Sequence, residues 1–525
     1  MRVFVCAIFL CFLCSCQPST PSSNSTVRIN IKDEPQTLDP RKARRLNDQT
    51  VVHMLFDGLL RVGKNKKAEL AVAKSVEISE DLKTYTFELK ETYWSNLDRV
   101  TAHDFVYAWK KILSPEFPCD LSSALYGIKN AKKVKEGLVS LSELGVVALD
   151  EKTLLVELER PDPNFLEQVA LSSFSPINAK VDQENPTWMF EAESYVSNGP
   201  FILTSWEHQR ELQLKKNPLY WESSSVHLEK VVLEMVEEET ELKLFEKKEL
   251  DWAGSPLSTI PVDAIASLKR EGLLQKEEGL GTYFLRINTH HPILSNQKIR
   301  QALGHAINRT ALVEHVLKGG QTIALSLLPP FLESSQAPLF QDADVQGAVV
   351  LFNEALKDLG LNREEFPQIC YLYRRTDLNH LMAQAIQEEW RSLFGITVVL
   401  EAVEGKVFFD RVSKTDYDIS YGNWIADFSD PFDFLSIFKQ PLGSNNTHWT
   451  DLQYNALLDQ ACLEKESQKR KETLFAAEKI LIDQMPIIPL YYWNLLYLSQ
   501  PHLKEVVISP LGQLDLKWAF IEETR

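Results

Sequence analysis

Short stretches of alternating apolar and polar residues are interspersed along the chain with stretches in which apolar residues recur every three or four positions. Residues 84–90 and 153–159 largely alternate and are predicted to form strands. A helix is predicted to start after Thr101, whose side chain can cap it, and Asp104 favours the positive end of the helix dipole. The two periods together predict a mixed α/β protein.

The second half of the chain contains the longest helical patterns. One pattern starts at Lys298 and ends at Gly319-Gly320, where the absence of a Cβ suits a left-handed cap. Another covers 377–394, is closed by Gly395 and leads into a strand over 396–400. The other predicted elements of this half are helices over 450–484 and an extended, buried segment over 486–492.

The N-terminus is typical of an exported protein. Residues 1–15 are predicted to be a signal peptide, because Arg2 precedes an apolar run that is too short to span a bilayer with ease. The sequence Leu13-Cys14-Ser15-Cys16 resembles the bacterial lipobox, in which the last cysteine is lipidated and becomes the new N-terminus. Residues 16–26 are polar and indicate a flexible tether. We expect a lipid on Cys16 to anchor the protein to a membrane in the periplasm or cell envelope; an ordinary signal peptide that contains cysteines is the alternative.

Composition narrows the class of protein. A chain of 525 residues that is 44% hydrophobic can build two or three domains. The net charge of -17, with no stripe of basic residues, argues against a nucleic-acid partner. Outside the N-terminal segment three cysteines remain, and without a C-x-x-C pair we expect no metal site. These three are predicted to be small buried side chains: Cys119, Cys370 and Cys462.

The common catalytic motifs are absent from the sequence. It has no G-x-S-x-G elbow, no H-E-x-x-H pair, no Gly-rich phosphate loop and no dinucleotide fingerprint. We therefore expect no catalytic residues, no cofactor and a role other than that of an enzyme.

Five phrases, in order along nearly the whole mature chain, resemble the family of periplasmic oligopeptide- and dipeptide-binding proteins of ABC transporters. Each phrase alone is compatible with a cap, a strand edge or a turn, but their common order is the informative feature. The phrases are Glu34-Pro35-Gln36-Thr37-Leu38-Asp39-Pro40 followed by Leu55-Phe56-Asp57-Gly58-Leu59, Trp94-Ser95-Asn96 leading into 100–109, Ser197-Asn198-Gly199-Pro200-Phe201, Asn217-Pro218-Leu219-Tyr220-Trp221, and Tyr417-Asp418-Ile419-Ser420 running into Trp424-Ile425-Ala426-Asp427-Phe428.

The resemblance implies a two-lobed periplasmic-binding-protein type II fold, with two strands joining the lobes and an extra domain inserted in lobe one. The ligand would be a short peptide enclosed between the lobes, and the partner would be the permease of an ABC transporter. We expect a monomer. The implied ranges are 27–46, 190–285 and 500–525 for lobe one, 47–189 for the extra domain, and 286–499 for lobe two.

The resemblance also implies where a peptide would bind. Asp427 would take the N-terminal ammonium, although an aspartate in Asp427-Phe428-Ser429-Asp430-Pro431 can also serve as a cap or turn residue. The peptide backbone would pair with Glu34 and Gln36 on one side. On the other side it would pair with Gly422, Asn423, Trp424 and Ile425, and Tyr126 of the extra domain would reach the ligand.

The carboxylate end departs from the family pattern. Six residues before Asp427, where well-known oligopeptide binders carry an arginine that pairs with the ligand's C-terminus, this chain has Tyr421. A tyrosine cannot neutralise a carboxylate, so the preferred peptide length and end chemistry stay open. Five other cations are weak candidates for this role: Arg374, Arg375, His380, Lys318 and Arg411.

Two alternatives keep the fold and change the role. The same lobes can carry a murein peptide, haem or a nickel complex, because a fold does not determine its cargo. A surface sensor or adhesin that retains the lobes is the other alternative.

Overall fold

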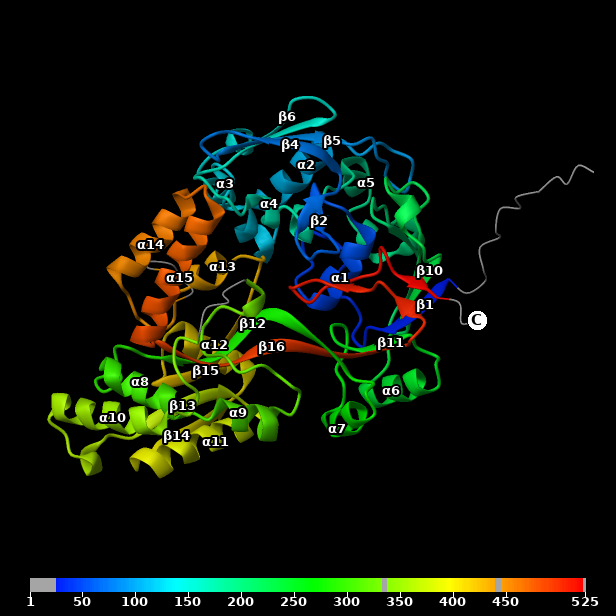
Figure 1. Cartoon of the computed structure of the whole chain (residues 1–525). Coiled ribbons are helices and arrows are strands. Elements are labelled where there is room, and N and C mark those ends of the chain that lie inside the picture. Colours follow the sequence, from blue (N-terminus) through cyan, green and yellow to red (C-terminus); the bar gives the residue numbers. More distant parts are fainter. Residues whose placement is uncertain (1–24, 333–337, 440–444, 523–525) are drawn as a thin grey trace, which may run out of the picture.

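The computed structural model describes residues 25–332, 338–439 and 445–522, and a ten-stranded sheet runs through it from one half of the molecule to the other (Figure 1). The strand order is β14 (Val398–Val403), β13 (Ile369–Arg374), β15 (Ile419–Ile425), β12 (Gln275–Ile287), β16 (Ile487–Ser499), β11 (Trp252–Gly254), β1 (Thr26–Asn30), β10 (Lys230–Glu234), β9 (Glu211–Lys216) and β8 (Phe201–Glu207).

The two halves are joined by β12 and β16, antiparallel strands of 13 residues each. The N-terminal part of β12 pairs with the C-terminal part of β16, which also pairs with β11. The C-terminal part of β12 pairs with β16 on one side and with β15 on the other. The pairing shifts register between Glu278 and Thr282. At this shift the ring of Trp493 packs so tightly on Gly279 that a Cβ there would overlap it. The irregular point between the halves is therefore a candidate hinge.

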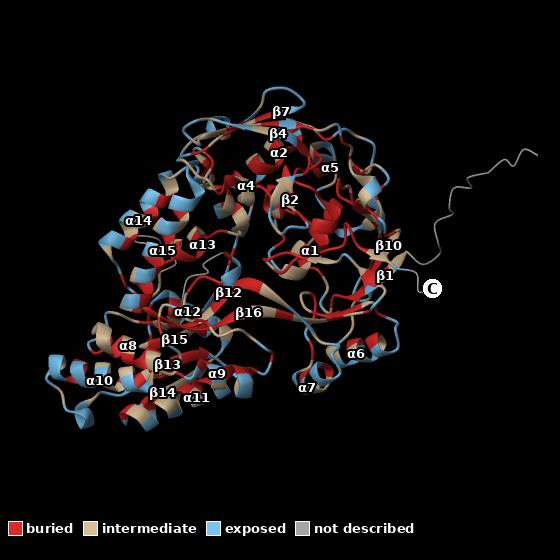
Figure 2. Cartoon of the chain, in the orientation of Figure 1, coloured by how far each residue is buried: buried red, intermediate tan, exposed pale blue. Residues whose placement is uncertain are grey.

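Lobe two has helices on both faces of its part of the sheet (Figures 1 and 2). One face carries α8 (Gln297–Ala306), α10 (Val345–Leu359) and α11 (Asp377–Phe394), which bury a core that includes Trp390 and Phe394. The other face carries α13 (Pro431–Ser436), α14 (Leu452–Leu463) and α15 (Ser467–Gln484), and these lie on the side of the extra domain. The helix α12 (Gly405–Ser413) packs near β13.

Lobe one holds strands β11, β1, β10, β9 and β8 of the large sheet, with helices α6 (Glu238–Glu246) and α7 (Val262–Arg270). Above it, the extra domain contains a four-stranded sheet of β4 (Ala73–Ile78), β5 (Thr84–Leu89), β7 (Thr153–Glu157) and β6 (Val146–Ala148), covered by α2 (Ala102–Leu113). Smaller elements here are α1 (Leu46–Leu55), β2 (Leu60–Val62), β3 (Ala68–Leu70), α3 (Ala131–Lys135), α4 (Phe165–Gln168) and α5 (Ala179–Glu184), with β17 (Leu503–Lys504), β18 (Val507–Ile508), β19 (Leu514–Asp515) and β20 (Phe520–Ile521) closing the chain.

A buried ion cluster fastens the extra domain to lobe one. The Arg41 guanidinium donates to Asp39 at 2.8 Å and to Asp182 at 2.6 Å, and all three side chains are almost fully buried. Burial opposes ionisation of Asp182, but the hydrogen bonds from Arg41 outweigh it and lower the pKa of this carboxyl to about 2.

Most of the predicted elements are confirmed. The strands predicted over 84–90 and 153–159 are β5 and β7, and a capping box between Thr101 and Asp104 starts α2. The helix predicted over 377–394 is α11, and Gly395 ends it with a φ of 72°.

The long helix predicted from Lys298 to Gly319-Gly320 is wrong. The helix α8 ends at Ala306, and a second helical segment consists of α9 (Arg309–Ala311) and a π-helix over Leu312–Leu317. The buried guanidinium of Arg309 donates to the carbonyls of Gly304 and Ile307, which occupies acceptors at the end of α8. The left-handed cap is Lys318, with a φ of 59°, rather than a glycine.

Other expectations have mixed outcomes. The prediction that Cys119, Cys370 and Cys462 are buried is wrong, because all three are half-buried. The signal peptide, Cys16 and most of the tether lie outside the described residues. Within those residues, no helix has the length and apolar character needed to cross a membrane. The implied domain ranges remain a prediction.

Candidate binding cleft between the lobes

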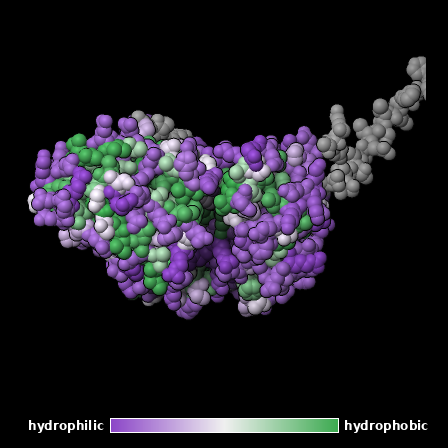
Figure 3. All heavy atoms as spheres, turned by 90° about the horizontal axis from the view of Figure 1, so that it is seen from below, coloured by the Kyte–Doolittle hydropathy of each residue, from purple (hydrophilic) through white to green (hydrophobic). Residues whose placement is uncertain are grey.

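A cavity of about 980 Å³ lies where lobe one, the extra domain and lobe two meet. The space-filling view shows a hollow between the two halves of the molecule (Figure 3). Lobe two contributes the segment 425–428, which starts at the last residue of β15, and the extra domain contributes Tyr126, Gln168 and Ser172. The hinge residue Trp493 also lines the cavity, so the cavity is in contact with the irregular point of β12 and β16.

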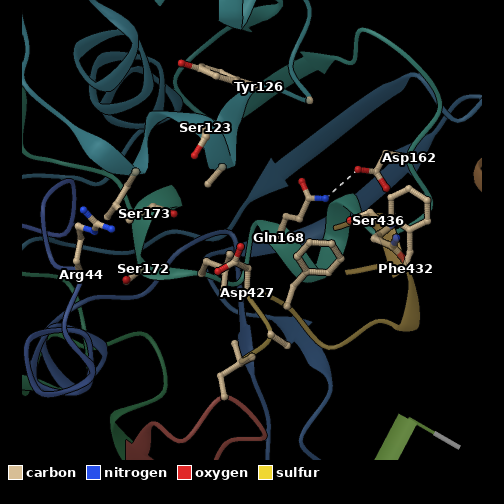
Figure 4. Close-up of a pocket in the computed structure, with 18 of the residues that line it drawn as sticks. Arg44, Ser123, Tyr126, Asp162, Gln168, Ser172, Ser173, Asp427, Phe432 and Ser436 are labelled. Carbon is tan, nitrogen blue, oxygen red and sulfur yellow. Dashed lines mark hydrogen bonds between the residues drawn. The ribbon is translucent and has the colours of Figure 1, made fainter. Parts of the chain in front are cut away.

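Asp427 points into this cavity, with Ser172 of the extra domain on one side and Gln168 on the other (Figure 4). The side chain is exposed to the cavity, and no described residue forms a hydrogen bond or ion pair with its carboxylate. The surrounding walls desolvate the carboxyl and raise its pKa. An acid that is partly desolvated and lacks a cation provides a site for the positive group of a ligand.

A second aspartate, Asp433, holds the turn that carries Asp427. The buried Asp433 carboxylate accepts a hydrogen bond from the indole N–H of Trp424 at 2.7 Å and from the backbone N–H of Asp427 at 3.2 Å. Burial, and then the negative charge of Asp427, raise the pKa of Asp433 well above its usual range. Asp430, the N-cap of α13, is fixed by two hydrogen bonds of 2.8 Å from Arg470.

Sequence reasoning named Asp427, which lines the cavity, and Trp424, which does not, but it did not name Asp433. Asp430-Pro431 is a recognisable helix start, because proline is favoured in the first turn. That signal predicts α13 but not that a residue in its first turn reaches back to β15. The positioning role of Asp433 depends on the fold of the loop 426–430.

The outer edge of β15 is open beside Asp427. The N–H of Ala426 donates to Leu280 of β12, so even-numbered residues of this strand direct their main-chain groups to β12 and odd-numbered ones direct them outward. On the outer side β13 pairs with β15 only as far as Ser420. In the described part of the chain, Asn423 and Ile425 therefore have no strand partner on that side, which is the arrangement that an added ligand strand requires.

The lobe-one residues predicted to contact a ligand do not line the cavity. The Glu34 carboxylate accepts a hydrogen bond from the Trp206 indole at 3.0 Å and pairs with His208 at 2.7 Å. Gln36 is exposed and its backbone N–H donates to Asp48. Tyr126, in contrast, lines the cavity, and its contact with a ligand stays a prediction.

Tyr421 lies outside the cavity lining as well. Its hydroxyl is 2.7 Å from that of Tyr491, and its ring stacks on Tyr283 at 5.9 Å in the core of lobe two. Burial raises the pKa of Tyr421 well above its usual range, so this phenol stays neutral.

The five weak candidates for a carboxylate-binding cation are also absent from the lining. Arg411 is paired with Glu401 at 2.6 Å, and His380 contacts the Tyr373 hydroxyl at 2.6 Å. Arg375 lies 3.8 Å from Glu404, and Lys318 forms the exposed left-handed cap. Arg374 is exposed at the end of β13.

Comparison with known proteins gives the context of this cleft. Residues 67–446 match the family of bacterial extracellular solute-binding proteins, family 5. The chain is 37% identical to the oligopeptide-binding protein OppA of Bacillus subtilis over 506 residues, which cover 95% of this chain and 93% of OppA.

Two solved structures bear on the arrangement of the lobes. The unliganded open form of the murein tripeptide-binding protein MppA has a TM-score of 0.84 and 26% identity, covering 96% of this chain and 99% of MppA. Haemophilus influenzae OppA in complex with RPPGFSPFR has a TM-score of 0.73 and 25% identity, covering 96% of this chain and all of that one. The two-lobed fold implied by the sequence is confirmed, and the chain belongs to family 5 of the bacterial extracellular solute-binding proteins.

Proposed function

We propose that this protein captures short peptides in the cleft between its lobes and delivers them to the permease of an ABC transporter. The ammonium of the peptide binds Asp427, and its backbone pairs with the open edge of β15. Binding is followed by closure of the lobes about the strands β12 and β16. The protein has no catalytic role in this process.

The observation that carries this proposal is the environment of Asp427. Its carboxylate lies in the cavity of about 980 Å³ with a raised pKa, and it forms no ion pair with a described residue. A peptide ammonium supplies the missing positive charge and a good hydrogen-bond donor. The names of the relatives agree with this chemistry, since B. subtilis OppA is an oligopeptide-binding protein and H. influenzae OppA has been solved with a peptide.

Peptide capture is tested by titration of the purified protein with tri- to pentapeptides. Tryptophan fluorescence reports binding, because Trp424 is hydrogen-bonded beside the proposed ammonium site and Trp493 lines the cavity. Calorimetry then compares the wild type with Asp427→Ala. We expect this substitution to weaken binding by about 3–5 kcal/mol, the usual cost of stranding one partner of a buried charge pair.

The matched control is Asp162→Asn, at another carboxylate of the same cavity. Asp162 already accepts a hydrogen bond from Gln168 at 2.8 Å, so it has a partner within the protein (Figure 4). The control is expected to bind peptides like the wild type. Unchanged affinity in Asp427→Ala, or a response to haem or a nickel complex but to no peptide, contradicts the proposal.

The membrane anchor is a separate part of the proposal. A lipid on Cys16 would hold the protein at the surface of a membrane in the cell envelope, with residues 16–26 as the tether. Cys16→Ser is then expected to move the protein from the membrane fraction to the soluble fraction without changing peptide affinity. Retention of Cys16→Ser in the membrane fraction contradicts lipid anchoring and leaves peptide capture intact.

A further inference from the structure

Arg286 crosses β15, the strand that leads to Asp427, at a point outside the lining of the cavity. It lies on β12 opposite Ser420 of β15, and its side chain passes directly over Gly422, where a Cβ would overlap the guanidinium. At the outer edge of β15 the guanidinium donates to the carbonyl of Tyr421 at 3.2 Å and to that of Asn423 at 3.5 Å. Glycine at position 422 is thus what gives this cation a path to the open edge.

No acidic side chain among the described residues pairs with Arg286. Besides the two carbonyls, its guanidinium lies 5.3 Å from the centre of the Phe284 ring, and the phenol of Tyr417 is the titratable group that acts on it. Burial lowers the pKa of Arg286, but an arginine starts from so high a value that the side chain remains charged at neutral pH. The site therefore holds a half-buried positive charge without a counter-ion.

Arg286 crosses the middle of β15, and Asp427 lies two residues beyond the C-terminal end of this strand. Gly422, beneath the guanidinium, is five residues from Asp427, which corresponds to at most about 16 Å if the chain were fully extended. An extended peptide of about four or five residues covers the same length. The outward N–H of Asn423 and the outward main-chain groups of Ile425 lie between the two charges.

The geometry points to Arg286 as the residue that binds the C-terminal carboxylate of a peptide whose ammonium is held by Asp427. This inference rests on the proposed function and adds the ligand class: peptides of about four or five residues with a free carboxyl terminus. The ligand carboxylate replaces long contacts to two carbonyls with charge-assisted hydrogen bonds. Tyr421 stands where the family resemblance implies an arginine, and Arg286 supplies that charge from the neighbouring strand instead.

The test compares a library of tetrapeptides with free carboxyl termini with the same library as C-terminal amides. In the wild type, amidation is expected to raise the apparent Kd about 10- to 100-fold, since hydrogen bonds to a charged group are lost. In Arg286→Gln, the free acids are expected to bind as weakly as the amides bind the wild type, so the ratio falls to about one. Arg286→Lys, which keeps the charge, should retain part of the ratio.

Arg374→Gln is the matched control, because Arg374 is an exposed arginine on the other neighbour of β15. It is expected to keep the wild-type ratio of acid to amide binding. Three results overturn the assignment but leave peptide capture intact. They are a ratio of amide to acid Kd near one in the wild type, an unchanged ratio in Arg286→Gln, and loss of the ratio in Arg374→Gln. A wild type that binds neither library overturns the proposed function together with this inference.

A measurement on the wild type alone keeps the test decisive if Arg286→Gln does not fold. Dipeptides held at Asp427 are too short to reach Arg286, so amidation of a dipeptide library should change its apparent Kd little. An amide effect on dipeptides as large as that on tetrapeptides places the carboxylate site elsewhere and overturns the assignment.

Discussion

Glu478 provides a sharp test of the packing of lobe two. It lies on α15, is almost fully buried, and accepts a hydrogen bond from the backbone N–H of Leu328 at 2.8 Å. Burial raises the pKa of its carboxyl from 4.5 to about 7. The folded protein therefore binds a proton at Glu478 over a range of pH in which the unfolded chain has already released it.

The sign of the effect on stability follows from this difference. Between pH 4.5 and 7 the native state holds more protons than the unfolded state, so the free energy of unfolding falls as the pH rises. One pKa unit corresponds to about 1.4 kcal/mol, so the whole shift is worth about 3 kcal/mol. Glu478→Gln keeps the acceptor for Leu328 and has no charge to bury, and it is expected to be about 3 kcal/mol more stable than the wild type at pH 7.5.

Urea unfolding at pH 4 and pH 7.5 measures this difference. The two proteins should be similar at pH 4, and the gap should open as the pH rises. Glu472→Gln, at an exposed carboxylate of the same helix, is the control and should follow the wild type. A Glu478→Gln protein that is less stable at both pH values, or that keeps the wild-type dependence on pH, refutes the reasoning.

Two further predictions concern the cleft. Peptide affinity should fall as the pH drops through the raised pKa of Asp427. The reason is that a bound ammonium favours the carboxylate form and so lowers the pKa of Asp427 in the complex. Calorimetry at several pH values should show that the affinity of Asp427→Asn depends less on pH. Gly279→Val should displace Trp493 at the hinge and reduce the ligand-induced compaction seen by small-angle scattering, whereas Gly405→Ala, where a Cβ has only an ordinary contact with Arg374, should compact like the wild type.

Local signals in the sequence were sufficient for much of the fold. The helix α11 has a clear apolar period and a glycine that ends it in the left-handed region, so its bounds could be predicted. The break after α8 could not, because it depends on the buried guanidinium of Arg309 binding carbonyls at the end of that helix. An apolar period alone does not show where a side chain from the next segment will occupy those acceptors.

The candidate site divides in the same way. Asp427 stands in a short phrase that resembles the family, Tyr126 is a contact that the resemblance implies, and both line the cavity. Asp433 and Arg286 carry no such phrase: one acts through a loop, and the other depends on strand register and on a glycine in the neighbouring strand. Their roles in the candidate site depend on tertiary contacts, and the sequence does not show which segments make those contacts.

The most direct test of the account is a crystal structure of the protein with a bound peptide. We expect the N-terminal nitrogen of the peptide within about 2.7–2.9 Å of the Asp427 carboxylate, in a closed cleft. A bound peptide that leaves this carboxylate in contact with solvent, or that places its ammonium against another group, contradicts the account.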